Sequence, residues 1–175
     1  MTAPAGLSNV IAIEAGGESG AYGDFGLALK GDGTVVGWGW NACNQVSVPA
    51  GLSNVVAIAS GACFSLALKS DGMVMGWGDT ELGEVPPPIG LTGVVAIAAA
   101  QYDGVALQGD GTTVAWGSHG SATATGVVAI ASGGGEGILT DGTLVDIDGN
   151  PAGPPGLGGV MAAANGGYHV LALAI

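Results

Sequence analysis

Side chains that could carry out nucleophilic or acid–base chemistry are few in this sequence. The 175 residues contain two histidines, His119 and His169, and no arginine. Neither histidine lies in the spacing that a Ser-His-Asp triad would need, and we expect His119 to be a solvated loop residue. The glycine-rich segment Gly133-Gly134-Gly135 lacks the Lys-Ser/Thr pair that follows a phosphate-binding loop. The sequence therefore predicts a protein without enzyme activity and without catalytic residues.

Two cysteines, Cys43 and Cys63, are the other reactive groups, and two interpretations of them stay open. A structural metal site takes four ligands from Cys and His, and the histidines lie far along the chain. We therefore expect no metal site. The cysteines are either two unbonded thiols or the partners of a disulfide between neighbouring repeats, and a disulfide would imply an oxidising compartment.

Acidic side chains suggest a cation at two places. The stretch from Asp146 to Asn150 resembles part of a calcium loop, but the distal glutamate of the full pattern is absent. Asp-Gly and Asn are also ordinary turn residues, and we favour that explanation. A second acidic group consists of Glu14, Glu18 and Asp24. We expect no cofactor, with calcium as the alternative.

The charge balance excludes whole classes of partner. The formal net charge is −12, and the only cationic side chains besides the histidines are Lys30 and Lys69. Binding to nucleic acid requires a cluster of cations that displaces counterions from the phosphates, and binding to an anionic membrane surface requires the same. We therefore expect neither partner.

The sequence also bears on location. The segment from Met1 to Pro4 has neither a basic region nor an apolar run, so the chain shows no secretory signal. No apolar stretch reaches the roughly 18 residues of a membrane span, so we expect no membrane insertion. Few Lys and Arg residues, with many Gly, Ala and Ser residues, favour an extracellular or cell-surface location.

Any site in this chain must be positioned by short strands and tight turns. Glycine accounts for 36 residues, hydrophobic residues for 48% and charged residues for only 9%. A disordered chain would show the opposite balance of hydrophobicity and charge, whereas glycine with Val, Ile, Ala and Leu is typical of many short strands. The length suits a single domain over residues 1–175.

An internal repeat organises the chain. Several anchors recur every 39 residues and in phase, which makes the period secure. They are the Asp-Gly pairs at Asp32, Asp71 and Asp110, the Trp-Gly pairs at Trp38, Trp77 and Trp116, and the leucines Leu29, Leu68 and Leu107.

Each unit has the pattern of three antiparallel strands. A Val-Val-Ala-Ile-like strand and a small-residue turn lead into a Leu-Ala-Leu strand, and an Asp-Gly turn of expected type I′ joins that strand to a Trp-Gly strand. The first unit carries about six extra residues, Glu18 to Gly23, in its first turn, and the last unit ends after its second strand. The sequence thus predicts an all-β array of about 14 strands with negligible helix. The units span approximately residues 6–50, 51–89, 90–124, 125–155 and 156–175.

The segment from Gly61 to Gly78 carries the pattern Gly-x-x-x-Ser-Leu-Ala-Leu-x-x-Asp-Gly-x-Val-x-x-Trp-Gly. This pattern resembles the repeat of the regulator of chromosome condensation family, above all its short bacterial variety. His169, before the last Leu-Ala-Leu strand, matches a packing position of that repeat. The resemblance implies tandem β-propeller-like blades, four and part of a fifth. The family's usual ring has seven blades, so this chain is either a closed small propeller or an open one completed by assembly. Nucleotide exchange on a small GTPase is not implied, because its loops and basic segments have no counterpart here.

Tryptophans give the first candidate positions. Trp38, Trp77 and Trp116 recur at one place in the unit, and we expect them to pack in the core between blades. Trp40 has no counterpart in the other units, where Asp79 and Ser118 stand, so it is our candidate for an exposed binding contact, with incidental packing as the alternative.

The end of the chain gives the second candidate. Residues Leu171, Leu173 and Ile175 belong to an apolar strand that no third strand follows, and natural proteins pair or cover such an edge. We therefore expect a structural protein that self-associates into an oligomer or filament through these residues, or a chain that closes onto its own first unit. The alternative is an extracellular binding module, lectin-like or adhesive, that uses loops on one face to bind another protein or a glycan.

Overall fold

The computed structural model of the chain describes residues 2–18, 22–81, 84–118, 121–131, 133, 135–146, 148–154, 157–165 and 170–174. Within these ranges the secondary structure consists of 14 strands and no helix. The predicted all-β array is therefore confirmed, with three strands in each of the first four units and two in the last. The described residues include no helix long and apolar enough to cross a membrane.

The strands form five small antiparallel sheets, one per unit, each in chain order. The second sheet represents the complete unit: Val55 pairs with Lys69 across the first two strands, and Leu66 pairs with Gly76 across the last two. The strands of the first four sheets are β1 (Val10–Glu18), β2 (Tyr22–Lys30), β3 (Val35–Gly39), β4 (Val55–Ser60), β5 (Phe64–Lys69), β6 (Val74–Gly78), β7 (Val94–Ala99), β8 (Asp103–Gln108), β9 (Thr113–Gly117), β10 (Val127–Ile130), β11 (Glu136–Leu139) and β12 (Leu144–Asp146). The fifth sheet consists of β13 (Val160–Asn165) and β14 (Val170–Ala174).

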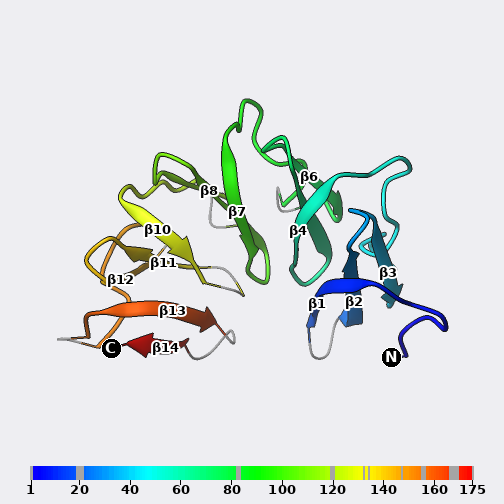
Figure 1. The fold of residues 1–175 in the computed structure, drawn as a ribbon, viewed down its shortest axis with the longest axis horizontal. Helices are drawn as coiled ribbons and strands as arrows, with labels where there is room; N and C mark the ends of the chain where they lie inside the picture. The colour runs from blue at the N-terminus through cyan, green and yellow to red at the C-terminus, as the bar shows by residue number, and fades with distance from the viewer. Residues whose placement is uncertain are drawn as a thin grey trace.

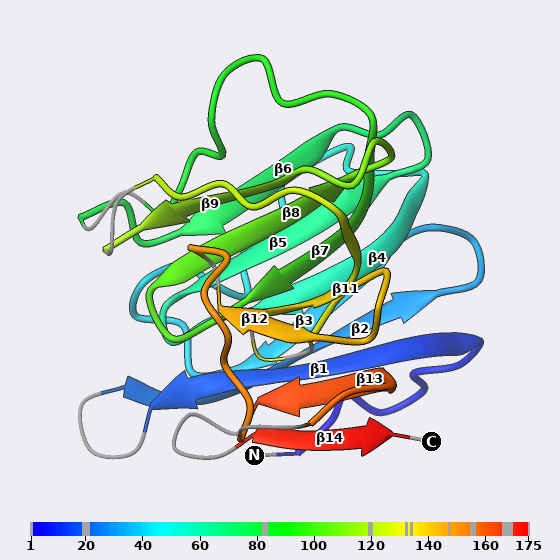
Figure 2. The same cartoon turned by 90° about the vertical axis from the view of Figure 1, so that its left-hand side faces the viewer.

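The five sheets lie side by side in an arc that is open between the first and the last sheet (Figure 1). The two ends of the chain lie on either side of this opening. Among the described strands, none of the fifth sheet is hydrogen-bonded to the first sheet. The described arc is therefore not a closed small propeller, and its completion by assembly stays a prediction. Figure 2 shows β14 at the lower margin of the molecule, with β13 above it.

The cores lie between the sheets, not within them. In the first core, Leu27 and Leu29 of β2 pack with Ile58 and Trp77 of the next sheet. The same arrangement recurs between the second and third sheets, where Leu66 and Trp116 share a cluster. A face of one sheet is thus covered by the opposite face of its neighbour, and the middle strand becomes buried on both sides. This explains why the Leu-Ala-Leu strands are continuously apolar rather than alternating.

The Asp-Gly turns differ from the predicted type I′. Gly33 has a φ of +76°, but Asp32 is not among the residues with positive φ. The Gly33 N–H donates to the Lys30 carbonyl at 2.9 Å, and the Lys30 N–H donates to the Thr34 carbonyl at 2.9 Å. These bonds define a three-residue loop that ends in a left-handed glycine, so only one residue with positive φ is needed.

The extra residues of the first unit also lie differently from expectation. They lengthen β1 and β2 to nine residues each, and Glu18 pairs with Tyr22 near the tip. The insertion thus extends the hairpin instead of enlarging a loop, because added residues that keep the pairing satisfy their backbone groups in the ladder. Residues 19–21 lie outside the described part of the chain.

Candidate interaction surfaces

Trp77 and Trp116 tie the second and the third sheet, respectively, to the sheet before it. Trp77 is 7% exposed and its Nε1 donates to the carbonyl oxygen of Gln45 at 2.8 Å. Trp116 is 3% exposed and donates in the same way to the carbonyl of Glu84 at 2.7 Å. Both acceptors lie in the linker that follows the preceding sheet, and both residues are buried. The indole therefore spans the junction and fixes the linker over the core.

None of the described sheets covers the leading face of the first sheet, and this face is exposed. Ile13 is 71% exposed, whereas Ile58, which occupies the same position in the second unit, is 6% exposed. Trp38 is half-buried, and no bond like those of Trp77 and Trp116 is recorded for it among the described residues. We call this surface the head; its residues are Val10, Ile13 and Trp38. Sequence reasoning missed the head, because Ile13 and Ile58 are the same residue at the same repeat position and only the structure shows that one is exposed.

The last sheet is exposed on its opposite face. Leu171 is 67% exposed and Leu173 is 59% exposed. Their counterparts in the second unit, Leu66 and Leu68, are 0% and 3% exposed. Within the described residues, β14 pairs only with β13, so its outer edge carries no third strand. We call this surface the tail, defined by Leu171 and Leu173; Ile175, the third residue expected there, lies outside the described residues.

Trp40 lies next to the lengthened hairpin. Its N–H donates to the Asp24 carbonyl at 3.0 Å, and its side chain is half-buried. A Cβ placed on Gly23 would lie 2.8 Å from Trp40 Cγ, so glycine permits the ring to lie directly on β2. The insertion thus gives Trp40 a packing partner, and its use as a binding contact stays a prediction.

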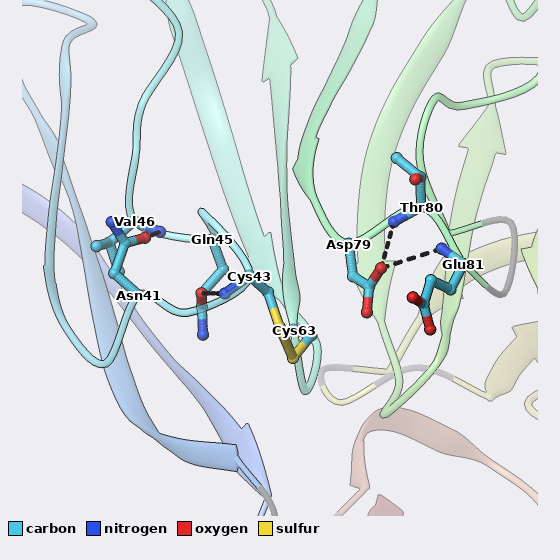
Figure 3. The surroundings of a disulfide bond; sticks show 8 residues. All are labelled: Asn41, Cys43, Gln45, Val46, Cys63, Asp79, Thr80 and Glu81. Carbon is cyan, nitrogen blue, oxygen red and sulfur yellow. Dashed lines mark hydrogen bonds between the residues drawn. A yellow bond between two sulfur atoms is a disulfide. The ribbon is translucent and has the colours of Figure 1, made fainter.

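A disulfide joins Cys43 to Cys63, with a Cα–Cα distance of 5.7 Å. It connects the linker after the first sheet to the turn between β4 and β5 of the second (Figure 3). A carboxylate oxygen of Asp79 lies within 4.8 Å of both sulfur atoms. Asp79 Oδ1 accepts hydrogen bonds from the N–H groups of Thr80 and Glu81, at 2.7 and 3.0 Å. With both sulfurs in a disulfide, neither is a thiolate ligand, because metal binding requires the deprotonated thiol.

Two of the acidic residues singled out from the sequence, Asp146 and Glu14, lie in different surroundings. Asp146 Oδ1 accepts the N–H groups of Asp148 and Asn150 at 3.0 and 2.8 Å, which is turn chemistry. Glu14 lines a cavity of about 260 Å³ together with Ser60, and burial raises the pKa of its carboxyl group. The Ser60 hydroxyl is buried, and no described residue forms a hydrogen bond with it. Both histidines, His119 and His169, lie outside the described residues.

Comparison with the sequence profiles of known protein families identifies one repeat of this chain. Residues 55–84 match the sequence profile of the regulator of chromosome condensation (RCC1) repeat. No curated protein sequence matches the chain.

Solved structures match the fold over most of the chain. The ectodomain of the receptor kinase CR4 from Physcomitrella patens superposes with a TM-score of 0.75 at 22% identity, over 95% of this chain and 51% of that one. Human WBSCR16 gives a TM-score of 0.71 at 18% identity, over 94% and 59%. Prp20p from Saccharomyces cerevisiae, described with its binding to Gsp1p and histones, gives 0.67 at 20% identity, over 86% and 54%.

The fold is therefore that of a β-propeller, of which the chain forms several adjacent blades. The repeat at residues 55–84 is of the RCC1 type, as the resemblance of the Gly61–Gly78 segment implies. The chain spans between about half and three-fifths of the length of these three structures.

Proposed function

We propose that this 175-residue chain is a non-catalytic scaffold of RCC1-type repeats that associates head to tail with further copies of itself. The observation that carries the proposal is the exposure of Leu171 and Leu173, at positions that are buried in the complete units. The head offers the other half of such a contact, because Ile13 is exposed where Ile58 is covered by the preceding sheet. Joining tail to head would repeat the interface that the chain already makes between its own sheets.

A head-to-tail contact uses two different surfaces, so each bound copy leaves one of each kind free. Such an interface grows into a filament, or into a ring if its rotation closes. The net charge of −12 on each copy opposes association. Added salt screens this repulsion beyond roughly 8 Å at physiological ionic strength and should therefore strengthen assembly.

The experiment is the solution mass, by light scattering, over a dilution series at low and high salt. We expect a mass that rises with concentration and with salt. Ile13→Asp should abolish the rise, since it places a charge in the head, and so should the pair Leu171→Asp and Leu173→Asp in the tail. Met73→Asp is the matched control, because Met73 is 52% exposed in a turn of the second unit, away from both ends. A wild-type mass equal to that of the monomer under all conditions would refute the proposal.

A second candidate is an extracellular binding module, which the disulfide Cys43–Cys63 favours. The similarity in fold to the ectodomains of plant receptor kinases points the same way. In this role Trp40 and the loops near it would contact a protein or a glycan. Mass spectrometry without reductant, on protein isolated from its natural source, shows whether the disulfide is present. Two free thiols would count against an extracellular binding module.

A further inference from the structure

Each of the five units carries one extra residue in its first strand, and that residue is always apolar and exposed. The register of the first two strands shifts between Val55 and Ala57, and at the corresponding place in every other unit. Such a shift marks a β-bulge. The bulge residues, with their exposed fractions, are Ile11 (66%), Val56 (53%), Val95 (60%), Val128 (56%) and Met161 (55%).

The bulges and the Asp-Gly turns lie at the same end of the sheets. The Ser70 N–H, just after β5, donates to the Asn54 carbonyl just before β4, at 2.9 Å. The turn of one unit also bonds to the first strand of the next, because the Val127 N–H donates to the Gly111 carbonyl at 3.0 Å. The five bulge residues therefore share one face of the arc with the Asp-Gly turns that join the second and third strands of the first four units, at Asp32, Asp71, Asp110 and Asp141. We call this face the turn face.

Packing within the chain does not account for the apolar bulge residues, because all five side chains are more than half exposed. A single exposed valine is ordinary on a protein surface, but a contiguous apolar patch marks an interaction site. Between the third and fourth units this surface is hollowed. A groove of about 330 Å³ lies there, with Val95 and Val128 among its walls and Leu107 and Asp110 beside them.

The charge on the turn face changes along the array. In the first two units the turn aspartate is neutralised, since Lys30 Nζ lies 3.0 Å from Asp32 and Lys69 Nζ lies 2.9 Å from Asp71. At the lysine position the third and fourth units have Gln108 and Leu139, which pair with Val94 and Val127 as the lysines pair with Val10 and Val55.

The aspartates of those two units, Asp110 and Asp141, keep their turns by accepting the N–H groups of Thr112 and Thr143 at 2.9 and 2.8 Å. The described residues include no cation paired with either carboxylate. Asp110 lines the groove together with the apolar residues Val95 and Val128, and Asp141 directly follows Thr140, which also lines it. The groove of the third and fourth units thus combines apolar side chains with anionic ones.

We propose that the turn face of the third and fourth units binds a basic protein segment that also carries apolar side chains. A lysine or arginine of the partner would pair with Asp110 and Asp141, while neighbouring apolar side chains would cover Val95 and Val128. A second copy of this chain does not fit the groove, because its two lysines already pair with its own aspartates and it carries a charge of −12. The proposal is independent of the association of head and tail.

Isothermal titration with three synthetic peptides of equal length tests this proposal. One alternates lysine with leucine, one alternates lysine with serine and one alternates glutamate with leucine. Only the first should bind with measurable heat, and its affinity should fall as salt is added, because the contact joins opposite charges. Self-association should show the opposite salt dependence.

Variants locate the binding site on the chain. The pair Val95→Ser and Val128→Ser should weaken binding of the lysine–leucine peptide about tenfold, since apolar contact area is lost. The pair Asp110→Asn and Asp141→Asn should weaken it roughly threefold to fivefold, as expected for exposed ion pairs; asparagine keeps the acceptor that caps the turn. Met73→Ser and Asp71→Asn are the controls in the second unit and should change the affinity less than twofold. Equal effects of the control variants, equal binding of the lysine–serine peptide, or no binding of any peptide would each overturn the proposal.

Discussion

The indole Nε1 of Trp77 donates a hydrogen bond of 2.8 Å to the carbonyl of Gln45, which lies 32 residues earlier and in the linker of the preceding unit. The Ser65 hydroxyl donates to the same oxygen, also at 2.8 Å. One buried carbonyl thus receives two donors from the next sheet, and the junction between the first and second units is fixed by polar contacts as well as by apolar packing.

Truncation of this ring should be costly. Trp77→Ala should lower the free energy of unfolding by roughly 3–5 kcal/mol, as expected for a buried aromatic side chain. Trp40→Ala should cost less than about 1 kcal/mol, because the Trp40 side chain is only half-buried. Urea unfolding followed by circular dichroism measures both, and a larger loss for Trp40 than for Trp77 would contradict the assignment of the structural ring.

The hydrogen bond can be separated from the ring. Trp77→Phe keeps an aromatic side chain but removes the donor. Loss of the hydrogen bond should lower the free energy of unfolding by about 1–2 kcal/mol, in addition to the loss caused by the smaller ring. The loss should be larger in a Ser65→Ala background, where the Gln45 carbonyl loses both of its donors. A double-mutant cycle on unfolding free energies measures this coupling, and simple additivity would show that the shared acceptor does not matter.

The disulfide should stabilise the junction that it crosses. Cys43 and Cys63 are 20 residues apart, and closing a loop of that size is worth about 3 kcal/mol in the chain-entropy account. The pair Cys43→Ser and Cys63→Ser should therefore lower the melting temperature, and reductant should lower that of the wild type but not that of the variant. A melting temperature of the wild type that reductant leaves unchanged would show that the bond contributes nothing to stability.

Acid should weaken the first Asp-Gly turn in a definite pH range. The side-chain hydrogen bond from Thr34, followed by that from Lys30, lowers the pKa of Asp32 from 3.8 to about 2. A carboxyl group whose pKa is lower in the folded state than in the unfolded state stabilises the fold at pH values above its unfolded pKa. This stabilisation is lost as the pH falls from about 4 to about 2.

Thr34→Val should therefore raise the pKa of Asp32, as measured by NMR titration of its carboxyl carbon. Thr112→Val, the equivalent change at Asp110, serves as the control and should leave the pKa of Asp32 where it is. An Asp32 pKa that stays near 2 in Thr34→Val would assign the shift to another cause.

The sequence predicts the strands well because its signals are local. The Asp-Gly and Trp-Gly pairs each consist of adjacent residues, and the period of 39 residues shows that they recur in the first three units. The bulges could not be predicted in this way, since a register shift between Val55 and Ala57 is a property of two paired strands. A local signal was present nonetheless: the residue before each first strand has positive φ, as Asn54 and Gly93 do, and Asn and Gly are the residues that tolerate this conformation.

The two free surfaces differ in how far the sequence predicts them. The apolar run at Leu171 and Leu173 is evident from the sequence, whereas Ile13 resembles every other residue at its position. Its exposure is a matter of tertiary arrangement, since none of the described sheets covers it. The sequence also leaves the closure of the ring undecided, because a closed ring and an open arc use the same strands.

The mass of a mixture tests head-to-tail association most directly. The head-blocked variant Ile13→Asp keeps its tail, and the tail-blocked variant Leu171→Asp/Leu173→Asp keeps its head. Each variant alone should be a monomer, and an equimolar mixture should form a dimer of one copy of each that grows no further, because both of its outer ends are blocked. Native mass spectrometry with one variant isotopically labelled resolves this species. A mixture that contains only monomers, or dimers of a single variant, would contradict association of tail with head.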